Sequence, residues 1–101
     1  MILVVSASGV TVEQAHDFKR FAMAVAGGLE GAELQHALGR LATLAEEDHA
    51  WVSETALRSM PGLRDDEAWQ KGLDGMIAYA RRHGWVDDTT QAIRAHIERR
   101  D

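Results

Sequence analysis

Histidines are the side chains of this sequence best suited to acid–base or metal chemistry at neutral pH. They stand at positions 16, 36, 49, 83 and 96. No two have the HxH or HxxxH spacing that places two imidazoles of one strand or helix on the same metal ion. The chain has no cysteine, so thiolate ligands, nucleophilic thiols and disulfides are excluded. We therefore expect no metal site and no cofactor.

Serine and carboxylate chemistry has no better support in the sequence. The segment SASG at 6–9 is not the G-x-S-x-G elbow that presents a nucleophilic serine. The adjacent acids at 46–47, 65–66 and 87–88 fall at expected helix ends or turns, where solvation or capping explains them. General acid–base catalysis needs a burial that surface acids lack. We therefore expect no catalytic residues.

Two glycines inside a helical pattern are the most specific sign of a binding surface. Gly72 and Gly75 each cost about 1 kcal/mol relative to alanine in a helix interior. They share one flank with Tyr79, beside the apolar line of the same helix. This flank could accept a second backbone, in a dimer or in a ligand groove with the Tyr79 hydroxyl, or it could pack tightly within the monomer. Sequence alone leaves both interpretations open.

The other candidate binding residues are basic or imidazole side chains, namely Arg81, Arg82, His83, Arg94 and His96. The first three end a helix, where cations stabilise the negative end of the helix dipole. The last two share one face with Glu98 if their segment is a strand. That face is either a small polar recognition patch or a solvated surface.

The periodicity of apolar residues predicts mostly helices before residue 85. The expected elements are a strand at 2–7 and helices at 12–26, 32–47, 54–60 and 65–83. The first helix is expected because TVEQ at 11–14 has the form of a capping box, and the second because its leucines recur at helical spacing. Pro61-Gly62 ends the short helix, and Asp65-Asp66 begin the long one.

The segment WVDDTTQAIRAHIE at 85–98 is compatible with two structures. As a helix, capped by Asp88 or Thr89, it has only two large apolar anchors, Ile93 and Ile97. As a hairpin, its apolar residues at 93, 95 and 97 face the core and alternate with polar ones. Helix propensity favours the first structure and the alternation favours the second. We expect the hairpin.

The order of these elements resembles a winged helix-turn-helix domain. A leucine-striped helix, a short extended AWV, a short helix and a tight PGLR turn precede the long helix, and ARRHGWV leads into a candidate wing. The resemblance covers about residues 32–98 and rests on element order and on this one local pattern. It implies an α+β, mostly helical fold with a winged-helix-like core, to which residues 1–31 add an N-terminal strand and helix. The alternative is an all-α bundle.

The resemblance also implies a place for DNA, which the charges do not favour. In that family the N-terminal part of the third helix enters the major groove. Here that part is DDEAWQKGLDG, and its three acids at 65–67 would lie against phosphates. DNA affinity depends on neutralising the phosphate charge, so these acids oppose binding. The residues available for such contacts are Gln70, Lys71, Arg81, Arg82 and Arg94.

Composition and charge restrict the remaining functions. The 101 residues predict one domain, with 46% hydrophobic and 27% charged residues as in ordinary globular proteins. No stretch is long enough to span a membrane, and the N-terminus lacks the form of a signal peptide, so we expect a cytoplasmic protein. Residues 28–67 hold nine acids against three arginines, which favours protein partners over nucleic acid.

The function expected from these observations is a non-catalytic protein-interaction or regulatory module of winged-helix type. It would bind a partner protein or, as a homodimer, a second copy of itself. One alternative is a DNA-binding transcriptional regulator. Another is a small accessory subunit of an enzyme system, with a pocket beside Tyr79, His83 and His96.

Overall fold

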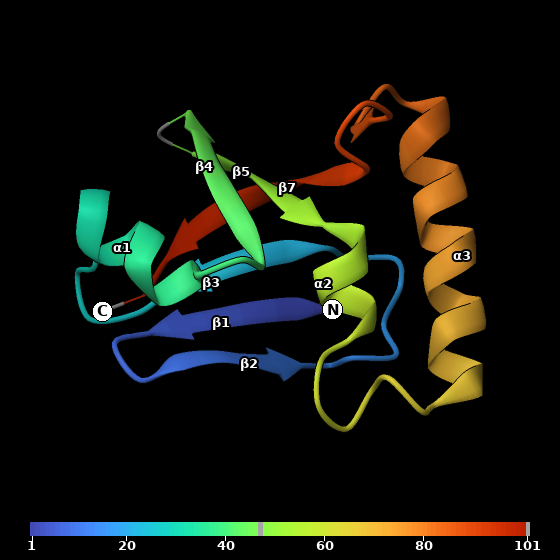
Figure 1. The fold of residues 1–101 in the computed structure, drawn as a ribbon, viewed down its shortest axis with the longest axis horizontal. Coiled ribbons are helices and arrows are strands. Elements are labelled where there is room, and N and C mark those ends of the chain that lie inside the picture. Colours follow the sequence, from blue (N-terminus) through green and yellow to red (C-terminus); the bar gives the residue numbers. More distant parts are fainter. Residues whose placement is uncertain (47, 101) are drawn as a thin grey trace.

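The computed structural model describes residues 1–46 and 48–100, which form an α/β fold around one mixed sheet. Its elements are β1 Ile2–Ser6, β2 Gly9–Glu13, β3 Ala22–Val25, α1 Gly31–Leu38, β4 Ala42–Glu46, β5 His49–Ser53, α2 Glu54–Arg58, α3 Glu67–Arg82, β6 Val86–Asp87 and β7 Ala92–Arg99. Six strands lie in the order β2-β1-β3-β7-β5-β4, and β6 pairs with β7 as the seventh (Figure 1).

Strand β7 organises the sheet because both of its edges are paired. One edge runs antiparallel to β5. The other edge is shared, since β6 pairs with Ala92 and Ile93 at the start of β7, and β3 runs parallel to residues 96–99 at its end. Between the two partners, the amide of Arg94 donates to the carbonyl of Trp85 at 2.8 Å. The junction between β6 and β3 is therefore a place where side chains from distant segments meet.

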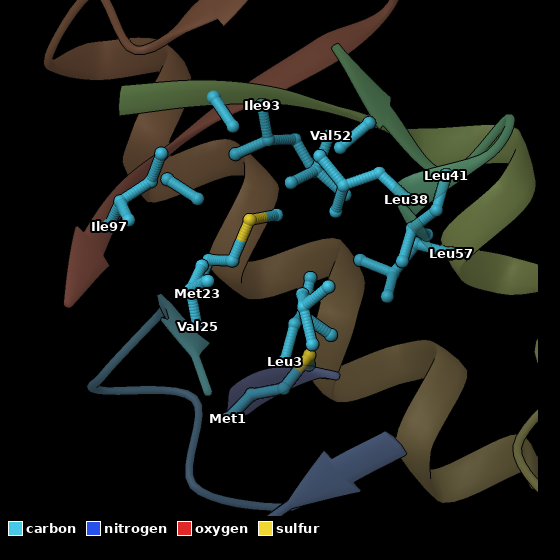
Figure 2. Close-up of a cluster of buried hydrophobic side chains, with 14 of the residues drawn as sticks. Met1, Leu3, Met23, Val25, Leu38, Leu41, Val52, Leu57, Ile93 and Ile97 are labelled. Atoms are coloured by element: carbon cyan, nitrogen blue, oxygen red, sulfur yellow. The ribbon is translucent and has the colours of Figure 1, made fainter. Parts of the chain in front are cut away.

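All three helices contribute to one core on one face of the sheet. The helical members of this core are Leu34, Leu38, Leu57, Trp69, Leu73, Met76, Ile77 and Ala80. Figure 2 shows Ile93 and Ile97 of β7 in the same cluster as Met23 of β3 and Leu3 of β1. The residues that alternate with them on β7, Arg94, His96 and Glu98, lie outside this core. In the described ranges, the opposite face of the sheet is therefore free of helices.

The expected C-terminal hairpin is confirmed. Val86 pairs with Ile93, and Asp87 pairs with Ala92, across a tight polar turn. Ile93 and Ile97 are 1% and 5% exposed, whereas His96 is exposed on the other face. The alternation of apolar and polar residues thus predicted the strand correctly against the helix propensity of the same residues.

The short and long helices also begin at the capping residues that the sequence indicates, although α2 ends at Arg58, before the predicted end at residue 60. The Ser53 hydroxyl accepts from the amide of Ala56 at 3.2 Å and caps α2. The Asp66 carboxylate accepts from the amide of Trp69 at 3.0 Å and caps α3, and this hydrogen bond lowers the pKa of Asp66 below its ordinary value. Helix α3 ends before Gly84, whose φ of +76° belongs to the left-handed region.

The helix predicted at 12–26 is wrong. Thr11 lies in strand β2, Gln14 adopts a positive φ of 50° in a turn, and residues 22–25 form strand β3. All four residues of β3 are buried, because the strand lies between β1 and β7 in the interior of the sheet. A short apolar run that is buried on both faces lacks strand alternation, so its spacing could not be told from that of a helix.

The helix predicted at 32–47 is wrong beyond its first half. Helix α1 ends at Leu38 because Gly39 adopts a φ of +58°, which ends a helix at little cost for glycine. The chain then returns as strand β4, which pairs with β5. The Gln35 side chain bonds the carbonyl of Ala42 at 2.9 Å and the amide of Leu44 at 3.0 Å, so α1 also protects the edge of this strand.

The resemblance to winged helix-turn-helix domains is therefore wrong, and so are the mostly helical fold and the all-α alternative. A winged helix needs three helices packed on one another before its hairpin, whereas here strands β4 and β5 stand between α1 and α2. Residues 1–31, expected as an added strand and helix, supply β1, β2 and β3 of the one sheet. The element order was misleading because two stretches with helical spacing are strands.

Candidate binding groove

A groove crosses the surface from the middle of α3 to the exposed face of β7. It consists of three adjoining hollows of about 410, 240 and 330 Å³. Their walls are Phe18, Lys19, Gly72, Gly75, Met76 and Tyr79 in the first, Phe18, Phe21, Tyr79 and Trp85 in the second, and Phe21, Trp85, His49, Arg94 and His96 in the third. Because neighbouring hollows share aromatic walls, we treat them as one site and call it the aromatic groove.

The segment before β3 forms one wall of the aromatic groove, opposite α3. It is held there by Trp69, whose indole N–H donates to the carbonyl of Ala15 at 2.9 Å. Phe18 and Phe21 follow in the same segment and are half-buried. Sequence reasoning missed both as site residues because their 3-residue spacing placed them on the buried face of a helix that does not exist.

The two glycines of α3 have different roles. A Cβ on Gly72 would lie 2.1 Å from Cε2 of Phe18, so this glycine permits the ring to pack directly against the helix backbone. A Cβ on Gly75 would meet nothing within 4 Å. Tight packing within the monomer thus accounts for Gly72, whereas Gly75 and the exposed Tyr79 leave an open stretch of groove.

Alanine substitutions at these glycines are expected to have opposite effects on stability. Gly72→Ala should lower the free energy of unfolding by about 1–3 kcal/mol, because the Phe18 ring must move. Gly75→Ala should raise it by about 0.5–1 kcal/mol, because the helix gains propensity without a clash. Urea unfolding measures both values. In a Phe18→Ala background Gly72→Ala should no longer be destabilising, and a persistent penalty would contradict the proposed contact.

Two wall residues of the groove, Tyr79 and Trp85, belong to a stack of three aromatic rings. The His83 ring lies 4.3 Å from the Tyr79 ring and 4.8 Å from the Trp85 ring, centroid to centroid and nearly parallel to each. Its Nδ1 also lies 3.0 Å from the Tyr79 carbonyl oxygen. Tyr79 and Trp85 remain 51% and 39% exposed, and they are the large hydrophobic side chains that stand exposed in the described ranges. The stack therefore presents two apolar rings to solvent in fixed positions.

The far end of the groove joins residues that are distant in the sequence. His49 of β5 is paired in register with His96 of β7, and their rings lie 5.7 Å apart. The Arg94 guanidinium lies 3.3 Å from Nδ1 of His49. His96 and Arg94 were predicted binding residues, but His49 was not, because no spacing in the sequence connects it to them.

The charges lining the aromatic groove are positive. Lys19 and Arg94 are its charged lining residues, accompanied by the imidazoles of His49 and His96. Arg82 lies 5.9 Å from the centroid of the Tyr79 ring and adds a further cation beside the stack. The whole chain carries a formal charge of −5, so the groove has the opposite sign to the protein as a whole.

Three predicted nucleic-acid residues lie apart from the groove or are engaged elsewhere. Arg81 forms an ion pair with Asp88 at 3.2 Å. The Gln70 side chain accepts from the Arg58 guanidinium at 2.9 Å and donates to the carbonyl of Arg58 at 3.1 Å. Lys71 lines a separate hollow at the start of α3 together with Asp65 and Glu67. The structure therefore does not bring the predicted nucleic-acid residues into one surface.

Comparison with known proteins adds no family to this description. No protein-family model matches the chain, and no curated protein or solved structure with which it was compared does so either. None of the helices in residues 1–46 and 48–100 has the length and hydropathy needed to cross a lipid bilayer.

Proposed function

We propose that the protein is a non-catalytic interaction module that binds a short segment of a partner protein in the aromatic groove. The segment would carry a large apolar or aromatic side chain next to Asp or Glu. The observation that carries this proposal is the exposed pair Tyr79 and Trp85, held in place by His83 within a groove of positive charge.

The shape of the groove favours a chain segment over a compact small molecule. Its three hollows are each near or below the lower end of the about 300–1,000 Å³ typical of small-molecule sites. Side chains of an extended segment can enter successive hollows, whereas a single compact ligand can fill only one. Aromatic residues are also the commonest energetic anchors of protein interfaces.

The charge of the groove favours acidic partners. Lys19 and Arg94, which line the hollows, attract carboxylates. Such complementarity raises the association rate and excludes basic partners. We also propose that the protein is located in the cytoplasm, where partner proteins are abundant.

The alternative functions have less support. DNA binding was suggested by the third helix of a winged helix-turn-helix, and that fold is absent. An accessory subunit with a pocket beside Tyr79, His83 and His96 would use the same groove, so it differs from our proposal in its partner and not in its site. A second copy of the chain is the remaining possible occupant, and a mass measurement in solution detects it.

Selection from a displayed library of random peptides tests the proposal with no assumption about which protein is the partner. We expect enrichment of sequences in which an aromatic residue adjoins Asp or Glu. Synthetic copies of these peptides should lose at least about tenfold in affinity for Trp85→Ala, as for an interface hot spot. Arg94→Glu should also bind them more weakly and should select basic sequences instead. All binding is measured with a chelator present.

A matched variant outside the groove serves as the control. Arg64→Glu reverses a charge in a separate hollow. It should bind the selected peptides as the unmodified protein does. Failure to enrich any peptide, or enrichment of peptides that bind Trp85→Ala equally well, would contradict the proposal. A dimer that dissociates on Trp85→Ala would instead identify a second copy as the occupant.

A further inference from the structure

Three potential metal ligands meet at the end of the aromatic groove. The ligand atoms of Asp48, His49 and His96 all lie within 4.8 Å of one another. The Asp48 carboxylate is 2.8 Å from Nδ1 of His49. We infer that these residues form a binding site for a divalent transition metal ion of the Zn²⁺ class. This inference does not depend on the proposed peptide binding.

The backbone holds the two imidazoles next to each other. The amide of Ile97 donates to the carbonyl of Asp48 at 2.7 Å, so these two residues form a hydrogen-bonded pair. The next pair along the β5–β7 ladder is His49 opposite His96. In an antiparallel ladder the pair next to a hydrogen-bonded pair is a non-hydrogen-bonded one, in which side chains approach most closely. The sheet therefore fixes the Cα positions of both histidines.

Small side-chain rotations would complete the coordination. Two nitrogen or oxygen ligands on a tetrahedral zinc ion lie about 3.3 Å apart, since each stands about 2.0–2.1 Å from the metal. The present separations, up to 4.8 Å, are close to that value, and Asp48 and His96 are exposed and can turn. An ion bound by Asp48 and Nδ1 of His49 would lie between two ligand atoms that are now 2.8 Å apart.

The ligand types determine which metals fit. Two imidazoles and one carboxylate suit Zn²⁺, Co²⁺, Ni²⁺ and Cu²⁺, whereas Mg²⁺ and Ca²⁺ prefer sites made of oxygen atoms. The carboxylate of Glu46 belongs to the residue paired with His49 on its other side and adds negative charge nearby. The third hollow adjoins the site, so water can occupy the remaining coordination positions.

Arg94 competes with the metal for the same nitrogen. Its guanidinium lies 3.3 Å from Nδ1 of His49, and its charge repels a cation. Arg94 is exposed, so its side chain can turn away when an ion binds. Arg94→Gln should therefore bind the metal more tightly than the unmodified protein, a result that nonspecific surface binding would not give.

Calorimetric titration of Zn²⁺ into the protein without an affinity tag tests the site. We expect one Zn²⁺ per chain, at least about tenfold weaker binding by His96→Ala and by Asp48→Asn, and no competition from Mg²⁺. Co²⁺ should give visible absorption bands of a nitrogen–oxygen site. Zn²⁺ should raise the thermal midpoint of the unmodified protein and not of His96→Ala, because the ion binds only the folded site.

His16→Ala is the matched control. His16 also lies beside an aspartate, with Nε2 3.2 Å from Asp66, but it has no second imidazole in the cluster. This variant should bind Zn²⁺ as the unmodified protein does. Should His49→Ala fail to fold because His49 is half-buried, the exposed His96 decides the question. Absence of Zn²⁺ and Co²⁺ binding, or binding unchanged in His96→Ala, would overturn the inference.

Discussion

Replacing Trp69 by alanine is expected to lower the free energy of unfolding by about 3–5 kcal/mol. Trp69 is fully buried and is the largest side chain of the core. Its removal would leave a cavity between α3 and the sheet, and the carbonyl of Ala15 would lose its hydrogen-bond donor. For a domain with a total stability of about 5–15 kcal/mol, this loss leaves a marginal fold.

Urea unfolding followed by far-ultraviolet circular dichroism measures the effect, since this signal does not depend on tryptophan. Trp69→Phe helps to separate the two contributions, because it removes the N–H donor and keeps most of the apolar volume. It should cost about 1–3 kcal/mol and should loosen the segment that carries Phe18 and Phe21. Trp85→Ala is the control, with an expected change below about 1 kcal/mol, because Trp85 is 39% exposed. Equal decreases in the free energy of unfolding for Trp69→Ala and Trp85→Ala would contradict the placement of Trp69 in the core.

Placing a charge at Ile93 is expected to abolish the fold. Ile93 is 1% exposed and lies in the part of β7 that pairs with both Val52 of β5 and Val86 of β6. An aspartate there would be an unpaired charge among apolar side chains. Burying such a charge lowers the free energy of unfolding by more than about 4 kcal/mol. Ile93→Asp should therefore show neither cooperative unfolding nor a native circular dichroism spectrum.

His96, which lies on the opposite face of β7 from Ile93, provides the control. His96→Ser should change the free energy of unfolding by less than about 1 kcal/mol, because His96 is exposed. This contrast tests the strand directly, since a strand places alternate residues on opposite faces. A stable Ile93→Asp variant, or a His96→Ser variant that fails to fold, would contradict the orientation of β7.

The site was partly predictable for the same reason that the hairpin was. Tyr79, His83 and Gly75 lie within one turn or two of each other on α3, so their proximity follows from helical geometry. The proximity of His49 and His96 does not, because it arises from pairing between strands that are far apart in the chain. The expectation of no metal site rested on local spacing, which cannot detect two histidines that are paired between distant strands. Phe18 and Phe21 were missed because their segment was predicted to be helical.

Local sequence determined the features whose partners lie nearby. The amphipathic α3 with its Asp66 cap and Gly84 stop, and the alternating β7, follow from interactions within a few residues. Only the tertiary structure decided that 22–25 and 42–46 are strands. Their apolar residues fit a helix equally well. Residues 22–25 form a strand by pairing with β7, which is far away in the sequence, and residues 42–46 by pairing with β5, which is itself held in the sheet by β7. The groove and the histidine pair are consequences of that pairing.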